Sequence, residues 1–427
     1  MKKLYSEKYI SAQEAVQKIK NGDKMAFVGN PEALFVALNE RMSELKGVET
    51  YNMISAGFSP HCSPEAVGHI HHNSLYVGVQ DRKPVEEGRA DFITRHYSRI
   101  PSFFTDVETM DVGLFHVSPP DKHGFVSFGI TVSFVFALFK TAKLKIAQVN
   151  RQMPRCHGDC FVHVSQFDWL VEADTPLREF PRAELTDVER AIGKNCADLI
   201  EDGATLQLGI GSLPDATLLC LKDKKDLGIH SEMFADGAMD LVEAGVITNA
   251  RKTLHPGKML ATFLMGTRKF FDFVDDNPSV YMAPVDYTND PYIIAQNDKL
   301  VSINSCIQID LMGQVCAESF GLRQYSAVGG QVDFVRGAQM SKGGISIIAI
   351  PSTTADLKIS KVVPFLDHGA AVTTSRNDVN FVVTEYGSFN LQGKSLRERA
   401  KGLIGLAHPN FRPALIEEYE KRFKNKW

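Results

Sequence analysis

A glutamate that follows a glycine-rich turn is the strongest candidate for chemistry in this chain. The stretch 206–242 reads LQLGIGSLPDATLLCLKDKKDLGIHSEMFADGAMDLV and predicts a strand, a turn, a helix, a short strand and then Glu232. The turn Gly209-Ile210-Gly211 can bend sharply and leaves its amides open to a ligand. The helix start that follows, with Pro214 in its first turn, offers unpaired N–H groups that favour an anion or a developing oxyanion. A glutamate beside such donors indicates acyl chemistry.

The elements around Glu232 explain how the turn and the carboxylate can meet. The strands 206–208 and 228–230 end at the turn and at Ser231-Glu232, respectively. In open α/β sheets, the carboxyl edge of the strands is where ligands bind. A glutamate after a strand can also be a helix N-cap or a solvated loop residue, so this stretch alone leaves both interpretations open.

Composition indicates an ordinary globular protein. The 427 residues predict two or three domains, and the apolar fraction of 44% and charged fraction of 23% are typical of soluble chains. A net charge of −4 gives no case for nucleic acid or an anionic membrane. The N-terminal sequence lacks the apolar core of a signal peptide, and the apolar run 132–139 is too short to span a bilayer. Seven scattered cysteines argue against a disulfide framework, so we expect a cytoplasmic protein.

Two segments follow the same order of elements: capping box, helix, strand, glycine turn, helix. They begin at Ser11 and Thr186. The first continues through the strand 24–28 to the turn Gly29-Asn30-Pro31, and the second reaches the turn at Gly209. This repetition predicts helices packed on a sheet in each half of the chain.

A second repeated pattern strengthens the case for two related halves. The strand 112–117 leads into an Asp121-x-x-Gly124 turn and another strand, and residues 302–308 lead into Asp310-x-x-Gly313 in the same way. The alternative is that unrelated βα units look alike. The proline-containing segment 173–183 predicts the connector, which gives domains 1–180 and 185–427.

Two groups of metal-binding residue types have a more ordinary interpretation. Cys156 and Cys160, with His157 and His163, could be zinc ligands, but the segment reads as a strand and favours small buried thiols. The histidines within 69–72 are predicted to lie in an exposed turn before a strand at 75–77. Rival carboxylates to Glu232 are Glu318, Asp333 and Glu385.

Several motifs, taken together and in order, resemble the acetyl-CoA hydrolase/transferase family of class I CoA-transferases, most closely 4-hydroxybutyrate and butyrate CoA-transferases. The resemblance covers essentially the whole chain. Its motifs are Val149-Asn150 with Met153-Pro154-Arg155, Gly209-Ile210-Gly211-x-x-Pro214, Ser231-Glu232-Met233, Gly329-Gly330-Gln331-x-Asp333-Phe334, Val383-Thr384-Glu385-Tyr386-Gly387, Gly393-Lys394-Ser395 and Ala407-His408-Pro409.

The resemblance implies a NagB/CoA-transferase-like α/β fold of two similar open α/β domains with the active site between them. The N-terminal domain would supply walls of the acyl pocket, and the C-terminal domain would carry Glu232 as the catalytic nucleophile. The oxyanion and CoA-binding groups implied are Gly209, Ile210, Gly211, Ser212, Leu213, Gly329, Gly330, Asn304 and Lys358. The acyl pocket implied consists of Gly29, Asn30, Pro31 and Gln207.

The same resemblance implies coenzyme A as a substrate, no metal, and a homodimer. Two departures leave the acyl group open: the turn at Gly29 is variable in the family, and Cys156 and Cys160 stand where the family usually has threonine or serine.

The leading functional hypothesis is CoA transfer between a short-chain acyl-CoA (4-hydroxybutyryl-, butyryl- or acetyl-CoA) and a carboxylic acid such as acetate, through a glutamyl-CoA thioester. An acyl-CoA hydrolase that uses water as the acceptor is the alternative within the class. A non-catalytic module that binds CoA or a nucleotide is the alternative outside it, and a sugar-phosphate isomerase is a second enzymatic alternative.

Overall fold

The computed structural model describes residues 5–55, 57–182 and 184–427, and the chain forms two compact units. Unit 1 comprises the chain up to Phe180 together with Leu260–Thr288, and unit 2 comprises Pro181–Met259 with Asn289–Trp427. The first crossing falls beside the proline-containing connector. The return of 260–288 to unit 1 differs from the sequence-based division, which placed this segment in the second domain.

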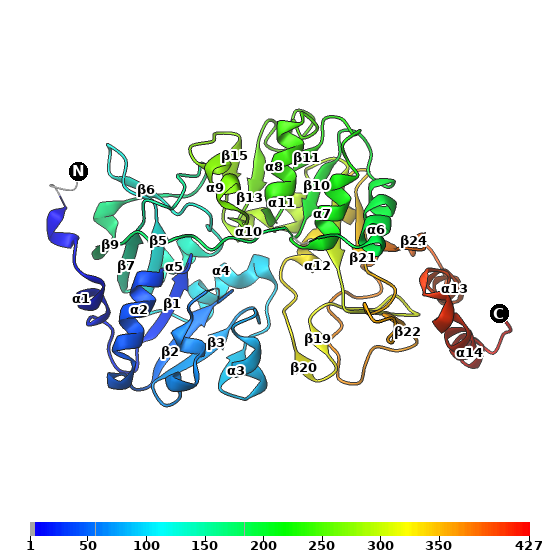
Figure 1. Cartoon of the computed structure of the whole chain (residues 1–427), viewed down its shortest axis with the longest axis horizontal. Helices are drawn as coiled ribbons and strands as arrows, with labels where there is room; N and C mark the ends of the chain where they lie inside the picture. Colours follow the sequence, from blue (N-terminus) through cyan, green and yellow to red (C-terminus); the bar gives the residue numbers. More distant parts are fainter. Residues whose placement is uncertain (1–4, 56, 183) are drawn as a thin grey trace. The chain divides into compact units, whose positions relative to one another are not determined.

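A parallel sheet forms the centre of unit 1 (Figure 1). Its strand order is β4-β3-β2-β1-β5-β7-β9, and adjacent pairs run parallel. The strands are β1 (Lys24–Val28), β2 (Val48–Asn52), β3 (Ile70–Ser74), β4 (Ala90–Phe92), β5 (Val112–Val117), β7 (Leu144–Val149) and β9 (Trp169–Glu172). Every residue of β5 is buried, as expected for a strand covered on both faces.

Helices and smaller strands complete unit 1. Helices α1 (Ala12–Val16) and α2 (Glu32–Glu40) contribute Ala15, Leu34 and Phe35 to a core shared with β1, β2 and β5. The other elements are α3 (Arg82–Glu86), α4 (Ile100–Ser102), β6 (Phe125–Ser127), α5 (Val135–Thr141), β8 (Phe161–His163), β13 (Met259–Ala261), β14 (Phe263–Leu264), α9 (Arg268–Val274), β15 (Val280–Met282) and α10 (Val285–Thr288).

Unit 2 contains a second mainly parallel sheet, in the order β11-β10-β16-β21-β23-β24, with β24 antiparallel to β23. Its strands are β10 (Thr205–Leu208), β11 (Gly228–Ile229), β16 (Leu300–Ser305), β21 (Ile345–Ala349), β23 (Phe381–Thr384) and β24 (Gly387–Asn390). Its helices are α6 (Asp187–Ala197), α7 (Ser212–Leu219), α8 (Asp236–Glu243), α11 (Pro291–Ile294), α12 (Gln331–Met340), α13 (Leu396–Leu406) and α14 (Arg412–Phe423). Short strands are β12 (Met233–Phe234), β17 (Gln308–Asp310), β18 (Val315–Cys316), β19 (Ser319–Phe320), β20 (Arg323–Gln324) and β22 (Val362–Val363).

The two units repeat one strand arrangement, which confirms the predicted pair of similar α/β domains. Strand β1 lies between β2 and β5, and β10 lies between β11 and β16. The two Asp-x-x-Gly turns also have the same hydrogen bonds. Asp121 Oδ1 accepts from the backbone N–H groups two and four residues later, and Asp310 Oδ1 does the same, at 2.8–2.9 Å. Both predicted capping boxes are present, at Ser11 and Thr186.

Among the described residues, none of the helices is both long enough and apolar enough to cross a membrane.

Candidate active site

Glu232 lies three residues after the end of β11 and directly before β12, close to the edge where β10 ends in its glycine turn. The strands β10 and β11 are parallel neighbours, so their carboxyl ends point the same way. The hydroxyl of Ser231 joins the two ends: its Oγ donates to Leu208 O (3.0 Å) and accepts from Leu208 N–H (3.2 Å). The carboxylate and the glycine turn therefore emerge from two backbone segments that share a side-chain link.

The carboxylate of Glu232 is held by two hydrogen-bond donors. Asn289 Nδ2 donates to Glu232 Oε2 at 2.8 Å, and the backbone N–H of Gly330 also donates to this carboxylate. A Cβ atom on Gly330 would lie 2.0 Å from Oε2 and 2.3 Å from Asn289 Nδ2. Because φ of Gly330 is −95°, the backbone conformation would permit other residues, so the close approach of Glu232 is what requires glycine here.

Burial, together with the negative charge of Asp333, raises the pKa of Glu232 to about 7. The donors Asn289 and Gly330 act in the opposite direction because they stabilise the ionised form. A carboxylate with this pKa is both ionised in a substantial fraction and poorly solvated near neutral pH. These are the properties that an attacking carboxylate needs.

Asn289 is a site residue that the sequence interpretation missed. It is fully buried and precedes α11, and 57 residues separate it from Glu232 in the chain. No motif marks it, and only its contact with the carboxylate shows its position.

The predicted glycine turn leaves open space around its backbone. Gly211 has φ of +117°, a conformation that side chains rarely adopt, and α7 begins at the next residue, Ser212. A Cβ on Gly209 or Gly211 would meet no atom of the described chain within 4 Å. Leu213 is buried and anchors the first turn of α7, while Ile210 is exposed. A ligand can therefore reach these backbone amides.

Gln207 and Asn304 lie together on neighbouring strands of unit 2. The hydroxyl of Ser302 donates to Gln207 Oε1 at 2.6 Å, and Asn304 Nδ2 donates to Ser302 Oγ at 2.9 Å. Lys358 lies in an exposed loop, where it pairs with Asp356 at 3.5 Å. Gly329, with φ of +54°, precedes Gly330 at the start of α12.

The predicted acyl-pocket residues Gly29 and Asn30 line a cavity of about 480 Å³ in unit 1. Its lining is rich in aromatic side chains, among them Phe27, Tyr97 and Phe134. Pro31 precedes α2 and is buried. Gln207 belongs to unit 2, as described above.

The polar wall of this cavity is built around His116. Its Nδ1–H donates to Gly29 O at 2.7 Å, and its Nε2 accepts from Asn150 Nδ2 at 3.0 Å. Burial lowers the pKa of His116 to about 4, so the ring is neutral near pH 7. Both ring nitrogens are used, which fixes the tautomer and keeps this wall uncharged.

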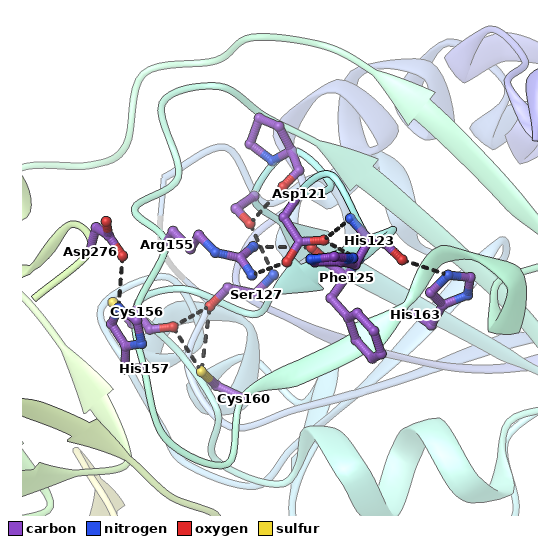
Figure 2. Close-up of polar contacts among 12 residues, drawn as sticks. Asp121, His123, Phe125, Ser127, Arg155, Cys156, His157, Cys160, His163 and Asp276 are labelled. Carbon is purple, nitrogen blue, oxygen red and sulfur yellow. Dashed lines mark hydrogen bonds and ion pairs between the residues drawn. The ribbon is translucent and has the colours of Figure 1, made fainter. Parts of the chain in front are cut away.

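The residues around Cys156 and Cys160 form separate polar contacts rather than a zinc site (Figure 2). His157 pairs with Asp276 at 2.8 Å, and His163 Nε2 donates to His123 O at 3.1 Å. Cys160 Sγ donates to Cys156 O, and both thiols are buried, which confirms the predicted buried thiols. The predicted strand begins later than expected, at Phe161.

Two of the rival carboxylates accept hydrogen bonds from residues other than those around Glu232. Glu385 accepts from the backbone N–H of Ser352 at 3.0 Å and from its hydroxyl. Glu318 accepts from Thr373 Oγ1 at 2.9 Å. Asp333 is buried in the first turn of α12 and acts on Glu232 through its charge.

The prediction of an exposed turn at residues 69–72 is wrong. Residues 70–74 form β3, and His72 is fully buried there. This strand lacks the usual apolar pattern. Its buried histidine is satisfied instead by hydrogen bonds with Thr50 Oγ1 and Asp81 Oδ1.

Comparison with known proteins agrees with this architecture. The Acetyl-CoA hydrolase/transferase N-terminal domain matches residues 1–178, and the corresponding C-terminal domain matches residues 266–419. The fold is that of the CoA-transferase class. The chain belongs to the acetyl-CoA hydrolase/transferase family.

Two curated relatives are similar over nearly their whole length. 4-Hydroxybutyrate coenzyme A transferase of Clostridium kluyveri is 54% identical over 98% of this chain and 99% of its own length. Butyryl-CoA:acetate CoA-transferase of Anaerostipes caccae is 39% identical, over 98% of this chain and 97% of its own length.

Solved structures show the same fold. The 4-hydroxybutyrate CoA-transferase of Porphyromonas gingivalis is 40% identical with a TM-score of 0.86, over 99% of this chain and 100% of that chain. RipA from Yersinia pestis is 38% identical with a TM-score of 0.93, over 99% of both chains.

Proposed function

We propose that this protein is an acyl-CoA:carboxylate CoA-transferase that acts on 4-hydroxybutyryl-, butyryl- or acetyl-CoA with an acceptor such as acetate. The relatives from Clostridium kluyveri and Anaerostipes caccae are CoA-transferases by name. The observation that carries the proposal is the partly buried carboxylate of Glu232, with a pKa of about 7 and two hydrogen-bond donors.

In the first half of the reaction, CoA moves onto the enzyme. A carboxylate oxygen of Glu232 attacks the acyl-CoA carbonyl, and the C–S bond breaks to give an acyl-glutamyl anhydride and CoA thiolate. The thiolate then attacks the Glu232 carbonyl carbon, and the donor acid leaves as its carboxylate. The product is a glutamyl-CoA thioester, and the reaction is split into easier steps.

In the second half, these steps run in reverse with a different acid. The acceptor carboxylate attacks the glutamyl thioester and releases CoA thiolate, which attacks the acyl carbonyl of the new anhydride. The new acyl-CoA leaves and the Glu232 carboxylate is restored. Confinement of the reacting groups can offset roughly 7–11 kcal/mol of the barrier, which compensates for the weak nucleophilicity of a carboxylate.

Asn289 and Gly330 have a specific part in this scheme. Whenever a nucleophile attacks the Glu232 carbonyl carbon, negative charge develops on the oxygen that remains. Their N–H groups already donate to this carboxylate, so they are placed to stabilise that charge. The open amides at Gly209–Gly211 would bind CoA and the acyl oxyanion, with Ser212, Leu213, Gly329, Asn304 and Lys358 as further CoA contacts.

Trapping the intermediate tests the proposal. The enzyme is incubated with acyl-CoA alone, and mass spectrometry is expected to find CoA attached at Glu232, with borohydride reducing that residue to the alcohol. The variant Glu232→Gln is expected to show neither product, whereas Glu318→Gln serves as the matched buried-carboxylate control and is expected to be labelled. A fully active Glu232→Gln enzyme would refute the proposed role.

Hydrolysis is the second candidate, because an acetyl-CoA hydrolase of Kluyveromyces lactis is 24% identical over 98% of this chain. CoA release that is unchanged by added acetate would identify a hydrolase, whereas formation of acetyl-CoA from butyryl-CoA and acetate would identify the transferase. We also propose a cytoplasmic homodimer, and sedimentation of the purified protein tests the dimer.

A further inference from the structure

A buried group of metal-binding side chains lies in unit 1, while Glu232 belongs to unit 2. His61, Cys62 and His72 each offer a ligand atom, and these atoms all lie within 4.8 Å of one another. Their exposed fractions are 3%, 8% and 0%. Asp81 is also fully buried, with its Oδ1 2.9 Å from His72 Nε2 and 3.7 Å from Cys62 Sγ. Four side chains of types that bind zinc therefore meet in one buried place.

Three separate segments bring these side chains together. His61 and Cys62 lie in the short 3-10 helix Pro60–Cys62, His72 lies on β3, and Asp81 directly precedes α3. The thiol and one imidazole thus come from a short 3-10 helix in the loop between β2 and β3, whereas the other imidazole lies on a strand of the sheet. A metal ion here would join the loop to the sheet.

The distances suit a tetrahedral ion after small movements. Zinc lies about 2.0–2.3 Å from nitrogen, oxygen or sulfur ligands, so its ligands are separated by roughly 3.3–3.8 Å. The separation of Cys62 Sγ and Asp81 Oδ1, 3.7 Å, already has this value, and that of His72 Nε2 and Asp81 Oδ1, 2.9 Å, must lengthen. A thiolate and a carboxylate together neutralise a divalent cation, which removes the cost of burying it.

The surrounding contacts orient the rings as a metal site requires. Thr50 Oγ1 hydrogen-bonds His72 Nδ1 at 2.9 Å, which leaves Nε2 facing Asp81. Such an outer contact is typical of metal-binding histidines. His61 Nε2 lies 3.0 Å from Ser55 Oγ, whereas His61 Nδ1 is a buried atom without a hydrogen-bond partner among the described residues. Ligation at Nδ1 would satisfy that atom.

Hydrogen bonds among the described residues satisfy the polar atoms of this group only in part. Ser55 Oγ donates to Asp81 Oδ1 at 2.8 Å, and Gly78 N–H donates to Asp81 Oδ2 at 2.9 Å. Cys62 Sγ has only long contacts, at 3.7 and 3.9 Å.

We propose that His61, Cys62, His72 and Asp81 form a structural site for a divalent transition metal of the zinc type. This site departs from the expectation, drawn from the family resemblance, that the protein has no metal. The segment that the ion would hold continues into Gly57 and Phe58, which line the 480 Å³ cavity. The ion therefore stabilises a cavity wall and takes no part in the transfer chemistry.

Cobalt substitution tests the proposal on the full-length protein. After treatment with a chelator, titration with Co²⁺ is expected to saturate at one ion per chain and to produce thiolate-to-cobalt charge-transfer absorption. The same titration is expected to raise the Tm. Metal analysis of the untreated protein is expected to find one zinc-type ion per chain.

Three variants identify the ligands. His61→Phe keeps a ring against Phe27 and Phe35 but removes a nitrogen ligand, and it is expected to weaken cobalt binding by more than about 100-fold. Cys62→Ser is expected to abolish the charge-transfer band. Cys160→Ser, at another buried cysteine, is the matched control and is expected to keep it.

Two results would overturn the proposal. One is a folded wild-type protein that gives no charge-transfer band with excess Co²⁺. The other is a band of unchanged strength in folded His61→Phe, which would place the cobalt elsewhere. Circular dichroism establishes folding in each case.

Discussion

A methyl group added at Gly330 gives the sharpest test of how Glu232 is held. In Gly330→Ala, the new Cβ would lie 2.0 Å from Glu232 Oε2 and 2.3 Å from Asn289 Nδ2, whereas real Cβ contacts essentially never fall below 3.0 Å. To reach 3.0 Å, the carboxylate must therefore move away by about 1 Å or more and the Asn289 amide must move as well, because the helix that begins at Gln331 limits how far the backbone can retreat.

The expected loss follows from that displacement. A misplacement of about 1 Å can cost roughly 100-fold in rate, and loss of one oxyanion donor costs about 10²–10³ in kcat, or roughly 2.7–4 kcal/mol. We expect kcat for CoA transfer to fall by about 10²–10³, with a similar loss in the rate of thioester formation. A steady-state transfer assay and a single-turnover measurement with acyl-CoA alone give the two values.

Gly405→Ala is the matched control. Gly405 lies within α13, and a Cβ there would meet nothing within 4 Å, so this change should preserve activity and can raise stability by up to about 1 kcal/mol. A folded Gly330→Ala enzyme with kcat within threefold of wild type would refute the arrangement of Glu232, Asn289 and Gly330 described above.

Four further predictions concern the same site and the cavity of unit 1. Asn289→Ala should lower kcat by about 10²–10³ with little change in Tm, and a single-turnover rate equal to wild type would contradict its role. Glu232 has a pKa of about 7 when folded and an ordinary model value of 4.5, so the unfolded chain ionises first and stability falls as pH rises between these values. The free energy of unfolding of Glu232→Gln should therefore rise relative to wild type by up to about 1.4 kcal/mol for each pH unit in this range. Urea unfolding of both proteins at pH 5 and at pH 7 measures this difference, and a difference that is the same at the two pH values would contradict the prediction. For the same reason, wild-type thioester formation should slow as pH falls below about 7. Asn30→Phe should change the ratio of kcat/KM between long and short acyl substrates by about 10–200-fold, while thioester formation from acetyl-CoA persists. Ratios that stay within twofold of wild type over C2 to C6 acids would exclude this cavity as the acyl pocket.

The sequence predicted the parts of the site that local chemistry determines. The turn from Gly209, the short strand before Glu232 and the Asp-x-x-Gly turns were readable because glycine, proline and aspartate constrain the backbone over a few residues. Strand periodicity and the repeated order of elements then gave two similar sheets. These features are determined by residues close together in the chain, so they can be predicted from one sequence.

The features that were missed depend on distant neighbours. Asn289 becomes a site residue only through Glu232, 57 residues away, and an asparagine before a proline-led helix gives no local sign of that contact. The segment 260–288 packs with unit 1 although the residues on both sides of it in the chain belong to unit 2. His72 was misplaced because a buried strand of histidine, asparagine and serine lacks the usual apolar pattern, and its partners Thr50 and Asp81 lie on other elements.

The double hydrogen bond of Ser231 has a consequence for how ligand binding reaches the nucleophile. One hydroxyl both donates to and accepts from the peptide groups of Leu208, the last residue before the glycine turn. Any ligand that immobilises the turn therefore also restricts the backbone of Ser231, and the adjacent glutamate loses freedom with it. Part of the entropy needed to orient the carboxylate is then lost when a ligand binds the turn, before any bond is made or broken.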